Sequence, residues 1–211
     1  RGFHTELETV YEEKNMSLTR DFRKALETLD GMLFPDHPYG TQTVLGTQEH
    51  LKNPSITNIK NYHKTYYVPN NMAICLSGDF DPDEMVSIIE KYFGQMEPNK
   101  ELPQLKLETK SVIETPQEKD VYGLDAETLM MGWKYPGAGT DEALVASVVS
   151  YILYNGSAGL IDLNINQQQK VLGAQSEAYT RPGAGEFIIM ANPKQGQTLE
   201  EVRDLLLSEI E

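Results

Sequence analysis

The sequence predicts an α+β fold, with helices packed over a mixed or mainly antiparallel sheet. Helical and strand-like segments alternate irregularly along the chain, the strand-like segments favour hairpins, and several helices carry one apolar face. We expect these helices to cover one face of the sheet. At 211 residues, the chain is long enough for one large domain or two small ones.

The charge balance excludes some classes of partner. The chain has 18 Lys and Arg residues against 32 Asp and Glu residues, which gives a net charge of -14. An acidic surface repels phosphate groups, and we find no local basic stripe that would offset it. We therefore expect no nucleic-acid partner and no binding to anionic membrane.

Six segments are expected to be helical, over residues 6–29, 55–67, 81–94, 141–155, 158–171 and 198–211. Each has apolar residues at helical spacing or clear end signals. Ser55 is the expected N-cap of the second helix, and Pro82 lies in the acidic first turn of the third. Thr198 and Glu201 have the spacing of a capping box at the start of the last helix.

The segments expected to be strands are 72–78, 110–116, 126–137 and the two halves of 173–193 around a Gly/Pro turn. The only cysteine, Cys75, lies in the apolar run "MAICLSG" and is expected to be buried in the first of these strands. A single cysteine allows no intramolecular disulfide, so it does not decide the redox compartment.

A polar segment with two prolines divides the chain into two domain-like halves. We expect a linker at residues 99–110, between a first domain at 1–98 and a second at 111–211. The first residue is Arg1, and we find no signal peptide and no apolar run of transmembrane length. We therefore expect a piece of a longer protein, whose compartment the sequence leaves open.

Glu6 and Glu13 are the candidate site residues. They are seven positions apart, so at about 100° per residue they return to nearly the same side of a helix, whereas Glu8 and Glu12 face elsewhere. The pattern is compatible with a solvated acidic face and with a metal site. A zinc hydrolase needs three protein ligands and an open position, and no two histidines have the i, i+4 spacing that would supply a pair.

The order of short motifs resembles the inverted-motif zinc peptidases, the group of pitrilysin, insulinase and the mitochondrial processing peptidase. "ELETVYEE" is followed by "HPYGTQTVLGT", by a helix ending in "YYVPNNM", and by "GDFDP" before a helix closing in "YFG". The resemblance covers about residues 3–97 and continues more loosely over 109–211. It implies two homologous-type sheet layers backed by helices, the first domain being truncated at its N-terminus.

What the resemblance implies for Glu6 and Glu13 is a role at zinc. Members carry H-x-x-E-H on one helix and a third ligand in a later E-x-x-x-x-x-x-E pattern. That pattern matches Glu6 through Glu13, which implies Glu13 as the zinc ligand and Glu6 as a supporting acid. H-x-x-E-H is absent from the sequence, and we expect it upstream in a longer parent. The chain alone is expected to be inactive and to bind no zinc tightly.

The second half departs from the family at two positions. Members often carry an Arg and, seven residues later, a Tyr that help to hold the substrate, and the matching positions are Asn166 and Gly173. Neither residue donates hydrogen bonds as Arg and Tyr do. The departure implies a long bacterial parent in which a later domain supplies the pair.

The implied function is that of a fragment of a zinc metalloendopeptidase, which degrades peptides or unfolded polypeptides inside an enclosed chamber. Its partners would be peptide substrates and the remaining domains of the same chain. One alternative is a non-catalytic homologue that serves as a scaffold or partner subunit, and another is a simple peptide-binding module. Because a missing helix would leave apolar surface bare, we expect an exposed patch, a rearrangement or a homodimer.

Overall fold

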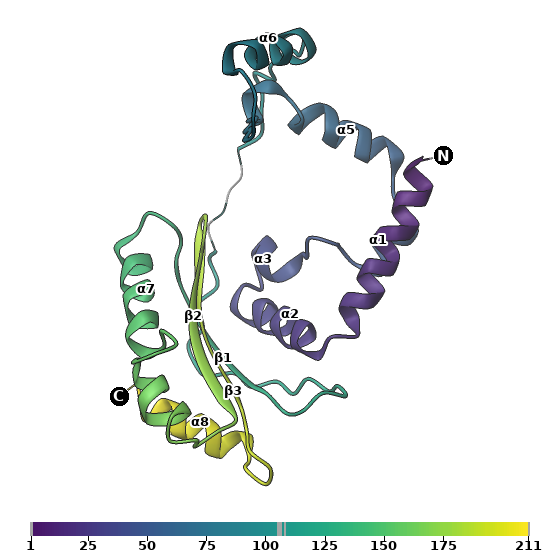
Figure 1. The fold of residues 1–211 in the computed structure, drawn as a ribbon. Helices are drawn as coiled ribbons and strands as arrows, with labels where there is room; N and C mark the ends of the chain where they lie inside the picture. Colours follow the sequence, from purple (N-terminus) through teal and green to yellow (C-terminus); the bar gives the residue numbers. More distant parts are fainter. Residues whose placement is uncertain (1, 105–106, 108, 211) are drawn as a thin grey trace. The chain divides into compact units, whose positions relative to one another are not determined.

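The computed structural model describes residues 2–104, 107 and 109–210, and combines helices with a small antiparallel sheet (Figure 1). The α+β class is confirmed. Parts of two predictions lie outside the described residues, namely 105, 106 and 108 of the linker and residue 211 of the closing helix. None of the described helices is both long and apolar enough to cross a bilayer.

The elements in chain order are α1 (Gly2–Leu18), α2 (Asp21–Leu33), α3 (Pro38–Thr41), α4 (Gln48–Lys52), α5 (Ile56–Tyr66), the 3-10 turn η1 (Pro69–Asn71), α6 (Pro82–Phe93), β1 (Leu129–Pro136), α7 (Asp141–Leu153), the π-helical turn η2 (Asp162–Asn166), β2 (Gly173–Arg181), β3 (Ala184–Asn192) and α8 (Leu199–Leu207). They form two compact units, a larger one of Arg1–Leu51 with Leu107–Glu211 and a smaller one of Lys52–Lys106. The division into homologous domains at 1–98 and 111–211 stays a prediction.

The larger unit is built around the central strand β3. The sheet has the order β1-β3-β2, and both pairings are antiparallel. Ile188 and Ile189 point to opposite faces of this strand, and both are fully buried. A strand that is apolar on both sides needs cover on both sides, so the sheet is covered on two faces instead of the expected one.

On one face, α7 and α8 cover the main core of the larger unit (Figure 1). Its buried members are Leu153, Ile161, Ile165, Val171, Ala174, Ile189, Ala191, Val202 and Leu206. On the other face, α2 packs on β1, where the side chains of Leu29 and Leu33 lie against Gly132. A smaller core of Leu33, Phe34 and Ala184 lies beside this contact.

Several helix ends are set by the expected capping residues. The Ser55 hydroxyl accepts a hydrogen bond from the backbone N–H of Asn58 at 3.2 Å, which confirms the predicted N-cap of α5. Thr198 and Glu201 form a complete capping box at α8, with reciprocal bonds of 3.2 and 3.0 Å. These contacts satisfy backbone N–H groups that have no partner within the helix.

Two predicted strands are wrong in the described structure. Residues 72–78 are irregular, and Cys75 is exposed rather than buried. An apolar run becomes a strand only when another strand pairs with it, and the described residues offer this segment none. Residues 110–116 are also irregular, and the N–H groups of Lys110 and Ser111 donate to the carboxylate of Asp36.

Two predicted helices differ in extent. The single helix expected over 6–29 is divided at Thr19 and Arg20, where the Thr19 hydroxyl donates to the Met16 carbonyl at 2.7 Å and Arg20 is extended. A side chain that bonds to its own backbone competes with continued helix. The helix expected over 158–171 is short and includes the π-helical turn η2.

Candidate functional site

The candidate metal-ligating residues lie on α1. Glu6 and Glu13 are both exposed and lie on nearly the same side of the helix. Seven residues of helix rise about 10 Å, so the two carboxylates start about two turns apart along the helix axis. Glu8 and Glu12 are exposed as well, and Glu12 accepts a bond from Asn15.

The rotation of α1 about its axis is fixed by the residue after Glu13. Lys14 is buried, and its Nζ lies 3.4 Å from Oε1 of Glu27 on α2. The next residue, Asn15, accepts a hydrogen bond of 2.6 Å from the side chain of Gln48. Because consecutive helical residues are about 100° apart, burying Lys14 against α2 leaves Glu13 on an open side.

The donor chemistry of α1 fits a single contributed ligand. In the described part of the chain, no group of three or more His, Cys, Asp or Glu side chains is placed to hold a metal ion. A carboxylate is a normal zinc ligand when two imidazoles complete the set, as in sites with two His and one Glu. The exposed carboxylates of Glu13 and of Glu6, two turns away, both have this donor chemistry.

Asn166, at the end of η2, bonds to the start of β2, where Gly173 lies. The Asn166 side chain donates to the carbonyl of Ala174 at 2.8 Å and accepts from its N–H at 2.9 Å. It therefore pairs with the strand as another strand would. Gly173 is the first residue of β2, and nothing lies within 4 Å of the place that a Cβ would take.

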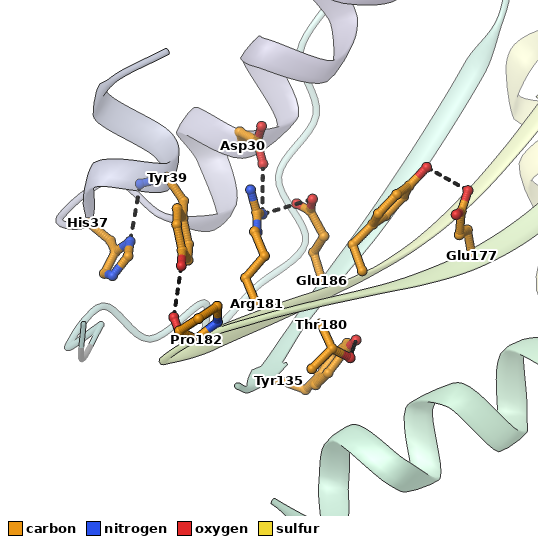
Figure 2. A network of polar contacts seen from close by, with 10 residues as sticks. Asp30, His37, Tyr39, Tyr135, Glu177, Thr180, Arg181, Pro182 and Glu186 are labelled. Atoms are coloured by element: carbon orange, nitrogen blue, oxygen red, sulfur yellow. Dashed lines mark hydrogen bonds and ion pairs between the residues drawn. The ribbon is translucent and has the colours of Figure 1, made fainter. Parts of the chain in front are cut away.

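A second polar cluster, which the sequence did not reveal, joins α2 to the β2–β3 hairpin (Figure 2). Nη2 of Arg181 lies 2.8 Å from Oε1 of Glu186 and 3.3 Å from Oδ1 of Asp30. The guanidinium carbon is 4.3 Å from the centre of the Tyr39 ring and 5.4 Å from that of Phe34. We call Asp30, Arg181 and Glu186 the junction cluster.

The "HPYG" turn is part of this junction. Tyr39 donates from its hydroxyl to the carbonyl of Pro182 in the hairpin turn at 2.9 Å (Figure 2). Nδ1 of the buried His37 accepts a bond of 3.1 Å from the N–H of Tyr39. Gly40 is needed here because a Cβ would lie 2.3 Å from the Phe34 carbonyl oxygen. The turn therefore connects helices to the sheet.

The electrostatics of the junction cluster are unusual for carboxyl groups. Glu186 is 4% exposed, and burial, helped by the nearby Asp30 carboxyl, raises its pKa to about 8 against the opposing effect of Arg181. On β2, burial and a hydrogen bond to Glu177 raise the pKa of Tyr179 to about 12. Burial in the central strand of the sheet therefore favours the protonated form of this carboxyl group.

The comparison with protein families gives one match over most of the chain. The model described as "Peptidase M16 inactive domain" matches residues 55–211. An uncharacterized zinc protease of Mycobacterium leprae is 37% identical over 62 residues, which are 29% of this chain and 14% of that protein. Zinc protease PqqE of Helicobacter pylori is 23% identical over 143 residues, covering 64% of this chain and 31% of that one.

Solved structures show the same fold. A protease from Helicobacter pylori superposes with a TM-score of 0.78 at 19% identity, over 98% of this chain and 51% of that chain. At this level of identity the likeness concerns the fold alone. The chain thus spans about half of this structure and smaller shares of the two relatives.

Proposed function

Because this chain belongs to the peptidase M16 family, we propose that it is part of a zinc metalloendopeptidase that degrades peptides or unfolded polypeptides inside an enclosed chamber. The observation that carries the proposal is the exposed Glu13, seven residues after Glu6 on a helix whose rotation Lys14 fixes. The names of the relatives as zinc proteases support it.

Glu13 would hold the metal as one of three protein ligands, and two histidines from outside these 211 residues would complete the set. When bound, zinc supplies Lewis acidity, which activates water at neutral pH and polarises a peptide carbonyl. The ion pair between Lys14 and Glu27 keeps α1 oriented so that the Glu13 carboxylate stays available. Glu6 would act through charge and hydrogen bonding, orienting groups near the metal.

The proposed activity is tested with the longer protein that contains this chain. We expect it to cleave fluorescently labelled unfolded casein, to lose that activity with a zinc chelator and to regain it with added zinc. A zinc-loaded protein that leaves casein and a panel of short peptides intact would contradict the proposal.

A non-catalytic scaffold or partner subunit is the second candidate function. It is favoured by one observation, that the matched family model describes an inactive domain. That match begins at residue 55, so α1 with Glu6 and Glu13 lies outside it. A parent with a disrupted H-x-x-E-H that binds unfolded peptides without cleaving them would support the scaffold, and an intact motif with cleavage supports the peptidase.

The chain by itself should bind zinc weakly, since one carboxylate ligand does not make a tight site. Calorimetric titration of the 211-residue chain with zinc checks this. The expected result is no binding in the nanomolar range. Tight 1:1 binding that Glu13→Gln abolishes would show that the chain holds a complete site.

A further inference from the structure

We infer that the junction cluster is a proton-linked latch, which holds α2 and the "HPYG" turn on the β2–β3 hairpin while its two carboxyl groups share one proton, and which weakens when that proton leaves. The inference concerns the packing of the larger unit and does not rest on the proposed function.

The junction cluster contains one positive charge, on Arg181, and two carboxyl groups, on Asp30 and Glu186. Arg181 reaches both carboxyl groups through the same nitrogen, Nη2. Its Nε and the Oε2 of Glu186 are buried without a hydrogen-bond partner among the described residues. With both acids ionised, the cluster would carry a net negative charge beside the buried carboxyl group of Glu186, which is costly. A proton on Glu186 removes that charge.

The strands beside β3 make no second ion pair with Glu186 among the described residues. Lys134 on β1 lies opposite Glu186 in the sheet register, but its Nζ donates to the carbonyl and hydroxyl oxygens of Ser111. Tyr179 on β2 is the register partner on the other side, and its hydroxyl donates to Glu177 at 2.5 Å. Both neighbours of Glu186 are thus engaged elsewhere.

The helical side contributes one acid and aromatic rings. Asp30 is the charged group of α2 that reaches the cluster, and Tyr39 stacks on Arg181. The ring of His37 is centred 4.4 Å from that of Tyr39, which lies between His37 and Arg181 in Figure 2. Among the described groups around Glu186, Arg181 is therefore the one cation paired with both acids.

The direction of the pH dependence follows from the raised pKa of Glu186. Burial first, and then the proximity of Asp30, move this pKa to about 8, above its usual value of 4.5. The native chain binds an extra proton between these two pH values, so the latch contributes its full stability below about 4.5. That contribution is lost as the pH rises through about 8.

Weakening the latch would release specific contacts. The small core of Leu33, Phe34 and Ala184 and the bond from Tyr39 to Pro182 join the same two segments. Helix α1 is attached to α2 through Lys14 and Glu27, so it would move with the helices. Opening is therefore expected to be local, at the helix–hairpin contact, before the main core unfolds.

Hydrogen–deuterium exchange of the 211-residue chain at about pH 6 and about pH 9, corrected for intrinsic exchange rates, tests the latch. In the wild type, protection of peptides covering residues 29–41 and 178–189 should fall by about a hundredfold between these conditions, relative to peptides from α8. Glu186→Gln, which keeps the shape of the protonated acid, should remove this fall. The matched variant Glu177→Gln, on the same hairpin, should retain it.

Two results would overturn the inference. One is wild-type protection at the junction that does not change with pH. The other is a Glu186→Gln chain that keeps the full wild-type pH dependence. If that variant fails to fold, carbon-13 NMR titration of the wild type decides: a Glu186 carboxyl that titrates near pH 8 supports the latch, and one that titrates near 4.5 contradicts it.

Discussion

At Arg181, one guanidinium group contacts two carboxyl groups and lies over two aromatic rings. The guanidinium group is planar, delocalised and always charged, so it can contact the carboxyl groups and the rings together. A lysine ammonium group would keep only part of these contacts. Replacing Arg181 removes the cation that is paired with both Asp30 and Glu186.

We expect Arg181→Met to lower the free energy of unfolding by about 3 kcal/mol, because removing one partner of a buried ion pair strands the other. Urea denaturation at neutral pH measures the change. Arg203→Met is the matched control, since Arg203 pairs with exposed Glu118 and Asp204, and such pairs contribute about 0–1 kcal/mol. Equal losses in the two variants would contradict the structural role of the junction cluster.

The candidate site residues that the sequence could indicate are those that lie close together in the chain. Glu6 and Glu13 lie on one helix, so a helical period and a family pattern brought them together. Asp30 and Arg181 are 151 positions apart, and only the fold makes them neighbours. The one local signal was Glu186 inside the run "GEFIIMA", since an acid in a strand buried on both faces needs a partner.

Among the elements, helix ends were predicted better than strands. A cap is a contact between residues three positions apart, so Ser55, Thr198 and Glu201 were found from the sequence and confirmed. A strand depends on a partner that is distant in the chain. Residues 72–78 and 110–116 have the composition of strands and yet lie outside the described sheet.

The capping box of α8 leads to a prediction at this scale. Thr198→Ala removes the bond to the Glu201 N–H and should cost about 1 kcal/mol in thermal or urea unfolding, because α8 carries Val202 and Leu206 of the main core. Thr9→Ala, in the exposed middle of α1, should change stability by less than about 0.5 kcal/mol. If Thr198→Ala lowers the free energy of unfolding by no more than Thr9→Ala does, the cap is excluded as a source of stability.

On the scale of the whole molecule, helix α7 leaves large apolar side chains uncovered. Those of Leu144, Val148, Tyr151 and Ile152 are between 51% and 71% exposed. A helix that is apolar all round is normally covered on more than one side. Bare apolar surface was expected where the first domain lacks a helix, whereas α7 lies in the second half of the chain, and dimerisation stays a prediction.

We expect the isolated chain to bind an apolar dye and to self-associate as salt is raised, since salt screens the repulsion between copies of net charge -14. Sedimentation velocity at low and high salt measures this. The double variant Leu144→Lys with Ile152→Lys should reduce both effects, and Tyr122→Lys, at an exposed residue outside α7, should not. A monomer that binds no dye at any salt concentration would contradict the prediction.

The central claim is that Glu13 supplies one zinc ligand to the longer protein that we propose contains this chain. The most direct measurement is the zinc content of that protein, by mass spectrometry after exhaustive dialysis, in wild type, Glu13→Gln and the control Glu12→Gln. We predict about one zinc per chain for wild type and Glu12→Gln, and a loss of most of the metal for Glu13→Gln. Full zinc occupancy in a folded Glu13→Gln protein would contradict the account.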